Sequence, residues 1–139
     1  MTLGERNNNP LNIRRGKTPW IGEIPQSSSP RGGREGAFVQ FATLEHGIRA
    51  AYQILDTYKQ KYHAVCIEDI ISRWAPPSEN DTEAYIRSVC TLTGFGGKER
   101  LTEAEWPALV KAMAVVESRM HLDAAILKTA YNLYLNLKR

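Results

Sequence analysis

The pattern of apolar and polar residues divides the chain into two regions. Residues 1–42 are rich in Gly, Pro, Asn and Ser and show no helical spacing, whereas residues 43–139 repeat apolar residues at helical intervals almost without interruption. The pattern predicts a mainly α protein with a single domain at 1–139. Within this domain we expect a loop and hairpin region at 1–42 and a helical region at 43–139.

Capping residues and helix-breaking residues mark where the first predicted helices begin and end. Thr43 is placed to cap a long amphipathic helix. A shorter helix is predicted at about 67–74, because two prolines follow it closely. Asn80, with Glu83 three residues later, is the start signal of a third helix, which Gly94 ends.

The second half of the helical region contains an unusually apolar helix. Thr102 and Glu105 form a capping-box pattern, and from 108 to 116 only Lys111 is polar. A helix that is apolar around nearly its whole circumference belongs at the centre of a domain. A final amphipathic helix is predicted at about 122–137.

The N-terminal region carries two short runs of β-prone residues. Residues 20–21 and 37–41 flank the flexible composition of residues 26–36, so the pattern predicts a small hairpin.

Residues 6–13, Arg-Asn-Asn-Asn-Pro-Leu-Asn-Ile, combine four asparagines with one proline. Asparagine tolerates left-handed backbone conformations and its side chain bonds nearby backbone, so the run predicts an ordered, turn-rich loop. Leu11 and Ile13 would anchor this loop, whereas the alternative is an unstructured N-terminal lead. The amide groups expected to face a ligand are those of Asn8, Asn9 and Asn12.

Composition and charge exclude few classes of function. The 139 residues are 42% hydrophobic and 24% charged, as in ordinary globular proteins. A net charge of +3 suits an anionic polymer, either nucleic acid or cell-wall glycan. No segment has the roughly 20 consecutive apolar residues of a membrane span. Residues 1–10 lack the apolar core of a secretory signal, so the localisation stays open.

The two cysteines and three histidines show no metal-binding spacing, so neither a metal nor another cofactor is expected. The thiols of Cys66 and Cys90 are expected to be free, with a disulfide between neighbouring helices as the alternative.

Glu117 stands at the end of the apolar helix. Partial burial and the negative end of the helix dipole both disfavour a carboxylate, so we expect a raised pKa for this side chain. A raised pKa suits a general acid that works near neutral pH. The alternative is a surface glutamate paired with Arg119 or Lys111.

Two sets of motifs resemble known families. Residues 112–119, Ala-Met-Ala-Val-Val-Glu-Ser-Arg, resemble the helix of lysozyme-like peptidoglycan hydrolases and lytic transglycosylases, where the glutamate of a Glu-Ser pair is the catalytic acid. Residues 7–14, Asn-Asn-Asn-Pro-Leu-Asn-Ile-Arg, resemble phage-associated virion and lysozyme-like proteins. So do residues 70–82, Ile-Ile-Ser-Arg-Trp-Ala-Pro-Pro-Ser-Glu-Asn-Asp-Thr, and the shorter blocks at 20–22, 38–41 and 47–50.

The order of these motifs differs from that of the glucosaminidase-type hydrolases. There the Glu-Ser helix precedes the asparagine segment, whereas here it follows the segment. The resemblance therefore suggests a circularly permuted lysozyme-like fold, in which Glu117 faces the loop at 7–12 across a cleft. Family members often carry Asn-Gly after the glutamate, where this chain has Ser118 and Arg119.

The sequence does not identify a second catalytic carboxylate. A lytic transglycosylase needs one acid, whereas a hydrolase of the usual kind needs two carboxylates. Glu45 fits the first turn of its helix better than a catalytic role. The glutamates of the first third of the chain are Glu5, Glu23, Glu35 and Glu45.

The two tryptophans next to these motifs carry different expectations. Trp20 is predicted either to stack on a sugar ring or to cover the small sheet, and Trp74 to pack at its helix end. Asn80 and Asp81 are expected to be cap residues.

The function implied by the resemblance is cleavage of peptidoglycan glycan strands by Glu117, with Trp20 and the asparagine loop contacting the sugars. The alternative is a non-catalytic structural or glycan-binding protein derived from a phage, with virion proteins as assembly partners. DNA binding is not expected, because the basic residues lie on loops without a recognition-helix pattern. These residues are Arg14, Arg15, Lys17, Arg31 and Arg34.

Overall fold

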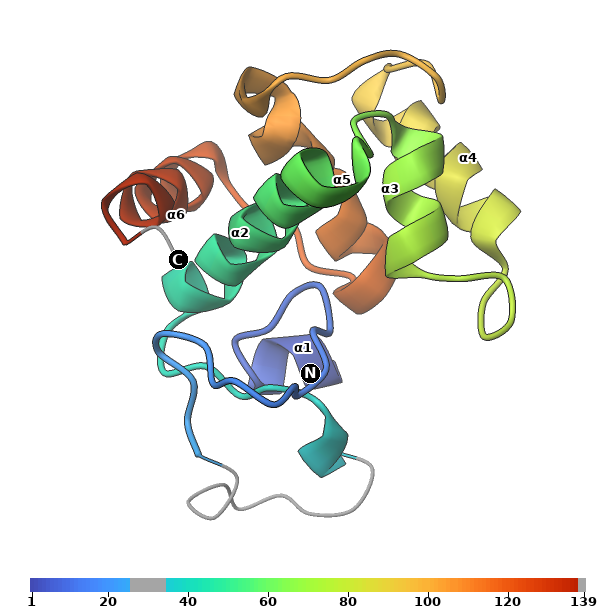
Figure 1. The fold of residues 1–139 in the computed structure, drawn as a ribbon. Coiled ribbons are helices and arrows are strands. Elements are labelled where there is room, and N and C mark those ends of the chain that lie inside the picture. Colours follow the sequence, from blue (N-terminus) through green and yellow to red (C-terminus); the bar gives the residue numbers. More distant parts are fainter. Residues whose placement is uncertain (26–34, 138–139) are drawn as a thin grey trace.

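The computed structural model describes residues 1–25 and 35–137 and consists mainly of helices (Figure 1). The mainly α class predicted from the sequence is therefore confirmed. The helices are α1 (Leu3–Arg6), α2 (Leu44–Tyr62), α3 (Ile67–Trp74), α4 (Thr82–Thr93), α5 (Trp106–Ser118) and α6 (Ala124–Asn136), with short 3₁₀ turns at η2 (Glu35–Ala37) and η3 (Glu103–Glu105).

The helix boundaries follow the capping residues closely. The Thr43 side chain accepts a hydrogen bond from the His46 amide at 3.2 Å, as predicted. Gly94 ends α4 with a φ of 79°, a left-handed conformation that suits glycine. The cap of α4 is Asp81, which accepts from the Ala84 amide, so the prediction that Asn80 is a cap was wrong.

Two helix starts differ in detail from the sequence-based expectation. The Thr102–Glu105 capping box is present, but it opens the turn η3 before α5 begins at Trp106. The last helix begins at Ala124, because Asp123 caps it by accepting from the Ile126 amide at 2.9 Å.

The short helix α1 was not predicted from the sequence. Thr2 and Glu5 form a reciprocal capping box, in which each side chain accepts from the backbone amide of the other residue. The spacing Thr-x-x-Glu is the sequence signal that marks this helix start.

The predicted N-terminal hairpin is not confirmed. Within the described residues, the second predicted segment, 37–41, forms only the isolated bridges Arg14–Phe38 and Glu23–Phe41, and neither bridge involves residues 20–21. The Val39 carbonyl accepts a hydrogen bond from the side-chain amide of Asn9, which takes the place of a backbone amide from a neighbouring strand. Residues 26–34 of the predicted flexible loop lie outside the described residues.

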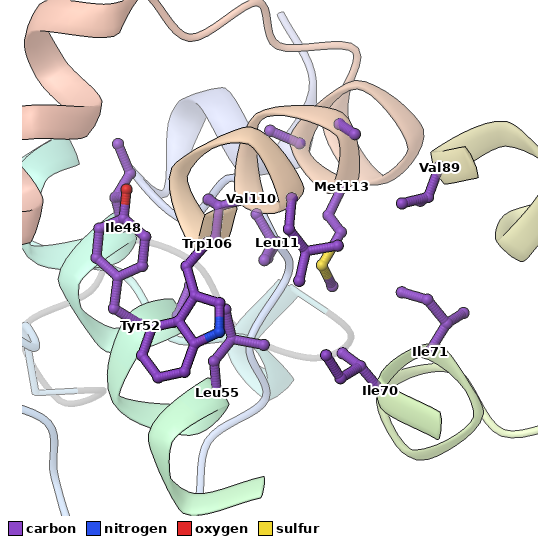
Figure 2. Close-up of a cluster of buried hydrophobic side chains, with 14 of the residues drawn as sticks. Leu11, Ile48, Tyr52, Leu55, Ile70, Ile71, Val89, Trp106, Val110 and Met113 are labelled. Carbon is purple, nitrogen blue, oxygen red and sulfur yellow. The ribbon is translucent and has the colours of Figure 1, made fainter. Parts of the chain in front are cut away.

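The central position of α5 is confirmed by its packing against α1, α2, α4 and α6. Its buried side chains include Trp106, Val110 and Met113, which meet side chains of α2, α3 and α4 in the main core (Figure 2). A second apolar cluster joins Ile13, Val39, Phe41 and Ala50, which places the N-terminal region on α2. The N-terminal region and the helical region are therefore packed together through apolar side chains.

The structure also bears on the predicted thiols and on membrane-spanning helices. Cys66 and Cys90 are both free, which agrees with the favoured expectation. In the part of the chain that the structure describes, no helix is long and apolar enough to cross a bilayer.

Candidate functional site

The asparagine loop is an ordered part of the structure. Asn8 and Asn12 both have a φ of 52°, in the left-handed region that asparagine tolerates better than most residues. Leu11 is 1% exposed in the main core and Ile13 is buried in the second cluster. Burial of one such side chain is worth about 1.5–3 kcal/mol. The predicted apolar anchors therefore hold the loop in place.

Asn9 is the structural centre of this loop. Its side chain is buried, donates to the carbonyls of Ile13 and Val39 at 3.0 and 2.8 Å, and accepts from the Ile13 amide at 2.9 Å. The side chain of Asn8 donates to the Phe41 carbonyl at 3.1 Å. These contacts hold the loop against residues 39–41, so the side chains of Asn8 and Asn9 are engaged in holding the loop together.

The loop meets the C-terminal end of α5, across 105 positions of sequence. The Asn12 side-chain amide donates to the main-chain oxygen of Glu117 at 3.2 Å and to its Oε1 at 3.3 Å. The buried Ser118 hydroxyl donates to the Pro10 carbonyl at 2.7 Å. Glu117 and the asparagine loop are thus in direct contact, rather than facing each other across a cleft as the motifs suggested.

The carboxyl group of Glu117 is partly buried and held by two donors. The Tyr85 hydroxyl donates to Oε2 at 3.0 Å, while Asn12 donates to Oε1. Burial raises the pKa of the Glu117 carboxyl, and the hydrogen bonds from Tyr85 and Asn12 oppose this shift. Burial and the adjacent Glu117 charge together raise the pKa of Tyr85 well above its usual value, so Tyr85 stays a neutral donor.

Glu117 opens onto a cleft of about 520 Å³. Within the described residues Glu117 forms no ion pair with Lys111 or Arg119, so the surface ion pair considered as an alternative is not seen. One wall of the cleft is the segment 12–20 with Phe38, and the other is formed by α2, α3 and the segment after α3. The lining residues are Asn12, Ile13, Arg14, Gly16, Lys17, Thr18, Trp20, Phe38, Ile54, Tyr58, Trp74, Ala75, Pro76, Glu79, Asn80 and Glu117.

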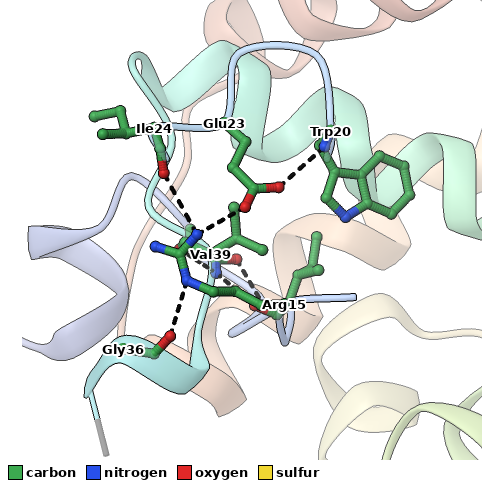
Figure 3. Close-up of polar contacts among 8 residues, drawn as sticks. Arg15, Trp20, Glu23, Ile24, Gly36 and Val39 are labelled. Carbon is green, nitrogen blue, oxygen red and sulfur yellow. Dashed lines mark hydrogen bonds and ion pairs between the residues drawn. The ribbon is translucent and has the colours of Figure 1, made fainter. Parts of the chain in front are cut away.

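A partly buried ion pair fixes the wall that carries Trp20 (Figure 3). Arg15 Nη1 lies 2.7 Å from Glu23 Oε2, and the side chains are 14% and 10% exposed. The other oxygen of Glu23 accepts from the Trp20 amide at 3.0 Å. The Arg15 Nε also donates to the Gly36 carbonyl at 2.8 Å, which ties residues on both sides of the undescribed segment together.

Trp20 and Trp74 both line the cleft and both pack against the second apolar cluster. The expectation that Trp74 packs at its helix end is confirmed, since its ring meets that of Tyr58 edge-on with centroids 6.1 Å apart. Both proposed roles of Trp20, covering the apolar cluster and facing a ligand, are open to it in this position.

Comparison with known proteins places the chain in a family. No family model matches the chain. The chain is 44% identical over 118 residues to protein P5 of Pseudoalteromonas phage PM2, and the match covers 83% of this chain and 70% of the phage protein. The chain belongs to the protein P5 family. The phage association predicted from the sequence motifs is therefore confirmed.

Three of the early glutamates, Glu5, Glu23 and Glu45, do not line this cleft. Glu5 caps α1, Glu23 pairs with Arg15, and Glu45 lies in the first turn of α2 as predicted. The side chain of Glu35 lies outside the described residues. The second carboxylate of the cleft is Glu79, an exposed residue whose amide donates to the Pro76 carbonyl.

Two cleft residues of this chain, and one residue that contacts Glu117 from outside the cleft, were not recognised as site residues from the sequence. Glu79 and Asn80 lie within the motif at 70–82, which was a usable signal for both. Tyr85 carried no such signal, because its helical position marks it only as a core residue.

The structure also bears on the other ligand classes considered. Among the described residues, no group of three or more His, Cys, Asp or Glu side chains is placed to hold a metal ion. Of the five basic residues considered for DNA binding, Arg15 is engaged by Glu23, and Arg31 and Arg34 lie outside the described residues.

Proposed function

We propose that this protein cleaves the glycan strands of peptidoglycan, with Glu117 as the general acid. The observation that carries the proposal is a partly buried carboxyl with a raised pKa, held by two donors at the side of an open cleft. A raised pKa keeps a carboxyl protonated closer to neutral pH, where it can donate to a glycosidic oxygen.

The hydrogen bonds of Glu117 are compatible with a cycle of proton donation. A tyrosine hydroxyl both donates and accepts, so the Tyr85 contact can persist when Glu117 carries its proton. The NH2 group of Asn12, which contacts Oε1, can only donate, so this contact favours the ionised carboxylate that remains after proton transfer. The two contacts hold the carboxyl plane in one orientation, which favours a productive geometry.

The walls of the cleft suit a chain of sugar rings. Trp20, Phe38, Tyr58 and Trp74 present aromatic surface, and Asn80 and Thr18 present polar groups. The cleft thus combines aromatic side chains with polar and charged ones, which together can orient a ligand that has apolar faces and polar edges.

The lysozyme-like fold and its circular permutation belong to this proposal. The support is the contact between the asparagine loop and the Glu-Ser end of α5, two motifs whose chain order is reversed relative to the hydrolases they resemble. Direct hydrogen bonds from Asn12 and Ser118 join these motifs in space.

The test is clearing of purified peptidoglycan sacculi by wild type and by Glu117→Gln. Loss of a general acid costs about 10²–10⁴-fold in rate, so we expect the variant to clear sacculi at least about 100-fold more slowly. Glu103→Gln is the matched control, since Glu103 also accepts from a tyrosine hydroxyl, that of Tyr131, but lies outside the cleft. Equal clearing by wild type and Glu117→Gln would contradict the role of Glu117.

Mass spectrometry of the products separates the two mechanisms. A lytic transglycosylase leaves anhydro sugar ends and needs one acid, whereas a hydrolase adds water and needs a second carboxylate, for which the cleft offers Glu79. No soluble product with wild type would favour the non-catalytic phage structural or glycan-binding protein instead.

A further inference from the structure

Two basic side chains on one wall of the cleft are available to a ligand. Arg14 and Lys17 are both exposed and both line the cleft. Among the described residues, no carboxylate lies within ion-pair distance of either side chain. Their positive charges are therefore not neutralised by the acidic side chains that the structure describes.

The neighbouring Arg15 has a different role. Its guanidinium is held by Glu23 at 2.7 Å and by the carbonyl of Gly36 at 2.8 Å, so its charge is used in building the wall. These two adjacent residues therefore have different roles, because Arg15 is directed into the wall and Arg14 borders the cleft.

Arg14 is held in position before any ligand arrives. Its guanidinium carbon lies 5.0 Å from the centroid of the Phe38 ring, and the backbones of the two residues form an isolated bridge. A cation held over an aromatic ring loses less conformational freedom when it binds an anion, which favours affinity.

The two acidic groups of the cleft come from other segments. Glu79 belongs to the segment after α3, and Glu117 belongs to the end of α5. With Glu117 protonated as the proposed general acid, a negatively charged substituent is repelled by the carboxylate of Glu79 and attracted by the wall at 14–17, so the two sides of the cleft differ in charge.

We infer that Arg14 and Lys17 form a subsite for a carboxylate carried by the glycan strand, so that the substrate is an acid-substituted glycan rather than a neutral one. The inference rests on the proposed function, because it concerns the same cleft. An Arg guanidinium binds carboxylates through two parallel hydrogen bonds, and a nearby lysine adds a point charge. In peptidoglycan the carboxylate can belong to the lactyl ether or to the peptide stem.

Three forms of one substrate test the subsite. The first is intact glycan carrying its peptides, the second is glycan stripped by an amidase so that the lactyl carboxylate remains, and the third is intact material whose carboxylates have been converted to amides. Two partly solvated charge pairs are worth a combined factor of about 10 in affinity. We therefore expect wild type to cleave the amidated material with a kcat/KM about 10-fold lower than the intact material.

The variant Arg14→Gln/Lys17→Gln removes both charges. It is expected to lose about 10-fold in kcat/KM on intact material, mainly through KM, and to cleave amidated material as wild type does. Lys98→Gln/Arg100→Gln is the matched control, because it removes one lysine and one arginine from exposed positions outside the cleft. The control corrects for the overall net charge.

The outcomes separate the subsite from the proposed function. Stripped glycan that is cleaved as well as intact material shows that the subsite also accepts the lactyl carboxylate that the amidase sets free, and stripped glycan that behaves like amidated material assigns the subsite to the peptide stem alone. Equal cleavage of intact and amidated material by wild type, or equal losses in the two double variants, would overturn the subsite while leaving the activity standing.

Sedimentation of the protein with intact and amidated sacculi tests the subsite independently of cleavage. If wild type cleaves nothing, the proposed function fails. The subsite then still predicts stronger binding of wild type to intact than to amidated sacculi, and this preference must disappear in Arg14→Gln/Lys17→Gln. Binding without such a preference would overturn the inference.

Discussion

At Glu117, opposing influences act on the pKa of one carboxyl. Burial raises this pKa, and the hydrogen bonds from Tyr85 and Asn12 lower it, with burial the larger effect. The donors therefore do more than hold the side chain, since they also limit how far its pKa rises. Tyr85 matters to the proposed chemistry although it does not line the cleft.

Tyr85→Phe is expected to move the pH profile of the proposed activity. The substitution removes a donor that favours the ionised form, so the pKa of Glu117 rises further. Because the general acid must be protonated, the alkaline limb of kcat/KM should shift to higher pH. The measurement is the rate of sacculus cleavage across pH.

Tyr131→Phe is the control for that measurement. It removes a similar tyrosine–glutamate hydrogen bond, to Glu103 at 2.9 Å, outside the cleft. The control is expected to leave the pH profile in place. If Tyr85→Phe lowers the activity by the same factor at every pH and does not shift the profile, Tyr85 does not act through the pKa of Glu117.

At the scale of elements, the asparagine loop is seated directly on α2. A Cβ at Gly47 would overlap the Asn8 carbonyl, and one at Gly4 in α1 would overlap the Ser118 hydroxyl. The absence of side chains at these two positions lets the loop approach α2 and lets α1 approach the end of α5. This close packing holds Asn12 where it reaches Glu117.

Gly47→Ala is expected to destabilise the protein although alanine favours helices. Alanine gains about 1 kcal/mol over glycine in an open helix, but the overlap with the Asn8 backbone costs about 1–3 kcal/mol. Urea unfolding should therefore show lower stability than wild type, with a larger loss in Gly47→Val. An increase of about 1 kcal/mol in Gly47→Ala would show that the loop is not packed against this helix.

Arg119 forms the C-terminal cap of α5. It ends α5 with a φ of 54°, a left-handed conformation that glycine and asparagine adopt more readily than arginine. The backbone turn after Glu117 and Ser118 is therefore made by a residue less suited to it.

For the molecule as a whole, the partly buried acid has a cost in stability. Because the pKa of Glu117 is raised in the folded state, the folded chain binds this proton more readily than the unfolded chain does. The contribution of Glu117 to the free energy of unfolding is therefore neutral below the ordinary pKa of 4.5 and becomes unfavourable as the pH rises through the folded-state value.

Glu117→Gln is accordingly expected to be more stable than wild type at neutral pH. The gain in melting temperature should shrink as the pH is lowered and vanish below about pH 4.5, where both states of the wild-type carboxyl are protonated. Thermal unfolding between pH 3 and 8 measures this difference in melting temperature. The variant Glu103→Gln is the comparison, because it removes one carboxylate elsewhere in the protein. A gain that does not change with pH would contradict the electrostatic origin.

The sequence by itself determined the features that depend on short-range interactions. Helix spacing, the caps at Thr43 and Gly94, and the apolar character of α5 involve residues within a few positions of one another, so they could be predicted. The asparagine loop and Glu117 were recognisable for the same reason, as local motifs. The cap at Asn80 was wrong because the neighbouring Asp81 accepts the cap hydrogen bond. The hairpin is not confirmed, because the described residues pair at isolated positions only.

The tertiary structure decided which of these residues share one site. Asn12 and Glu117 are separated by 105 positions, and Tyr85 reaches Glu117 across 32, so only the folded chain brings their donors to one carboxyl. It likewise buried Asn9 and left Arg14 exposed at the cleft, although both lie in the same run of sequence. The physical reason is that burial and pKa depend on neighbours from distant segments, which local patterns do not specify.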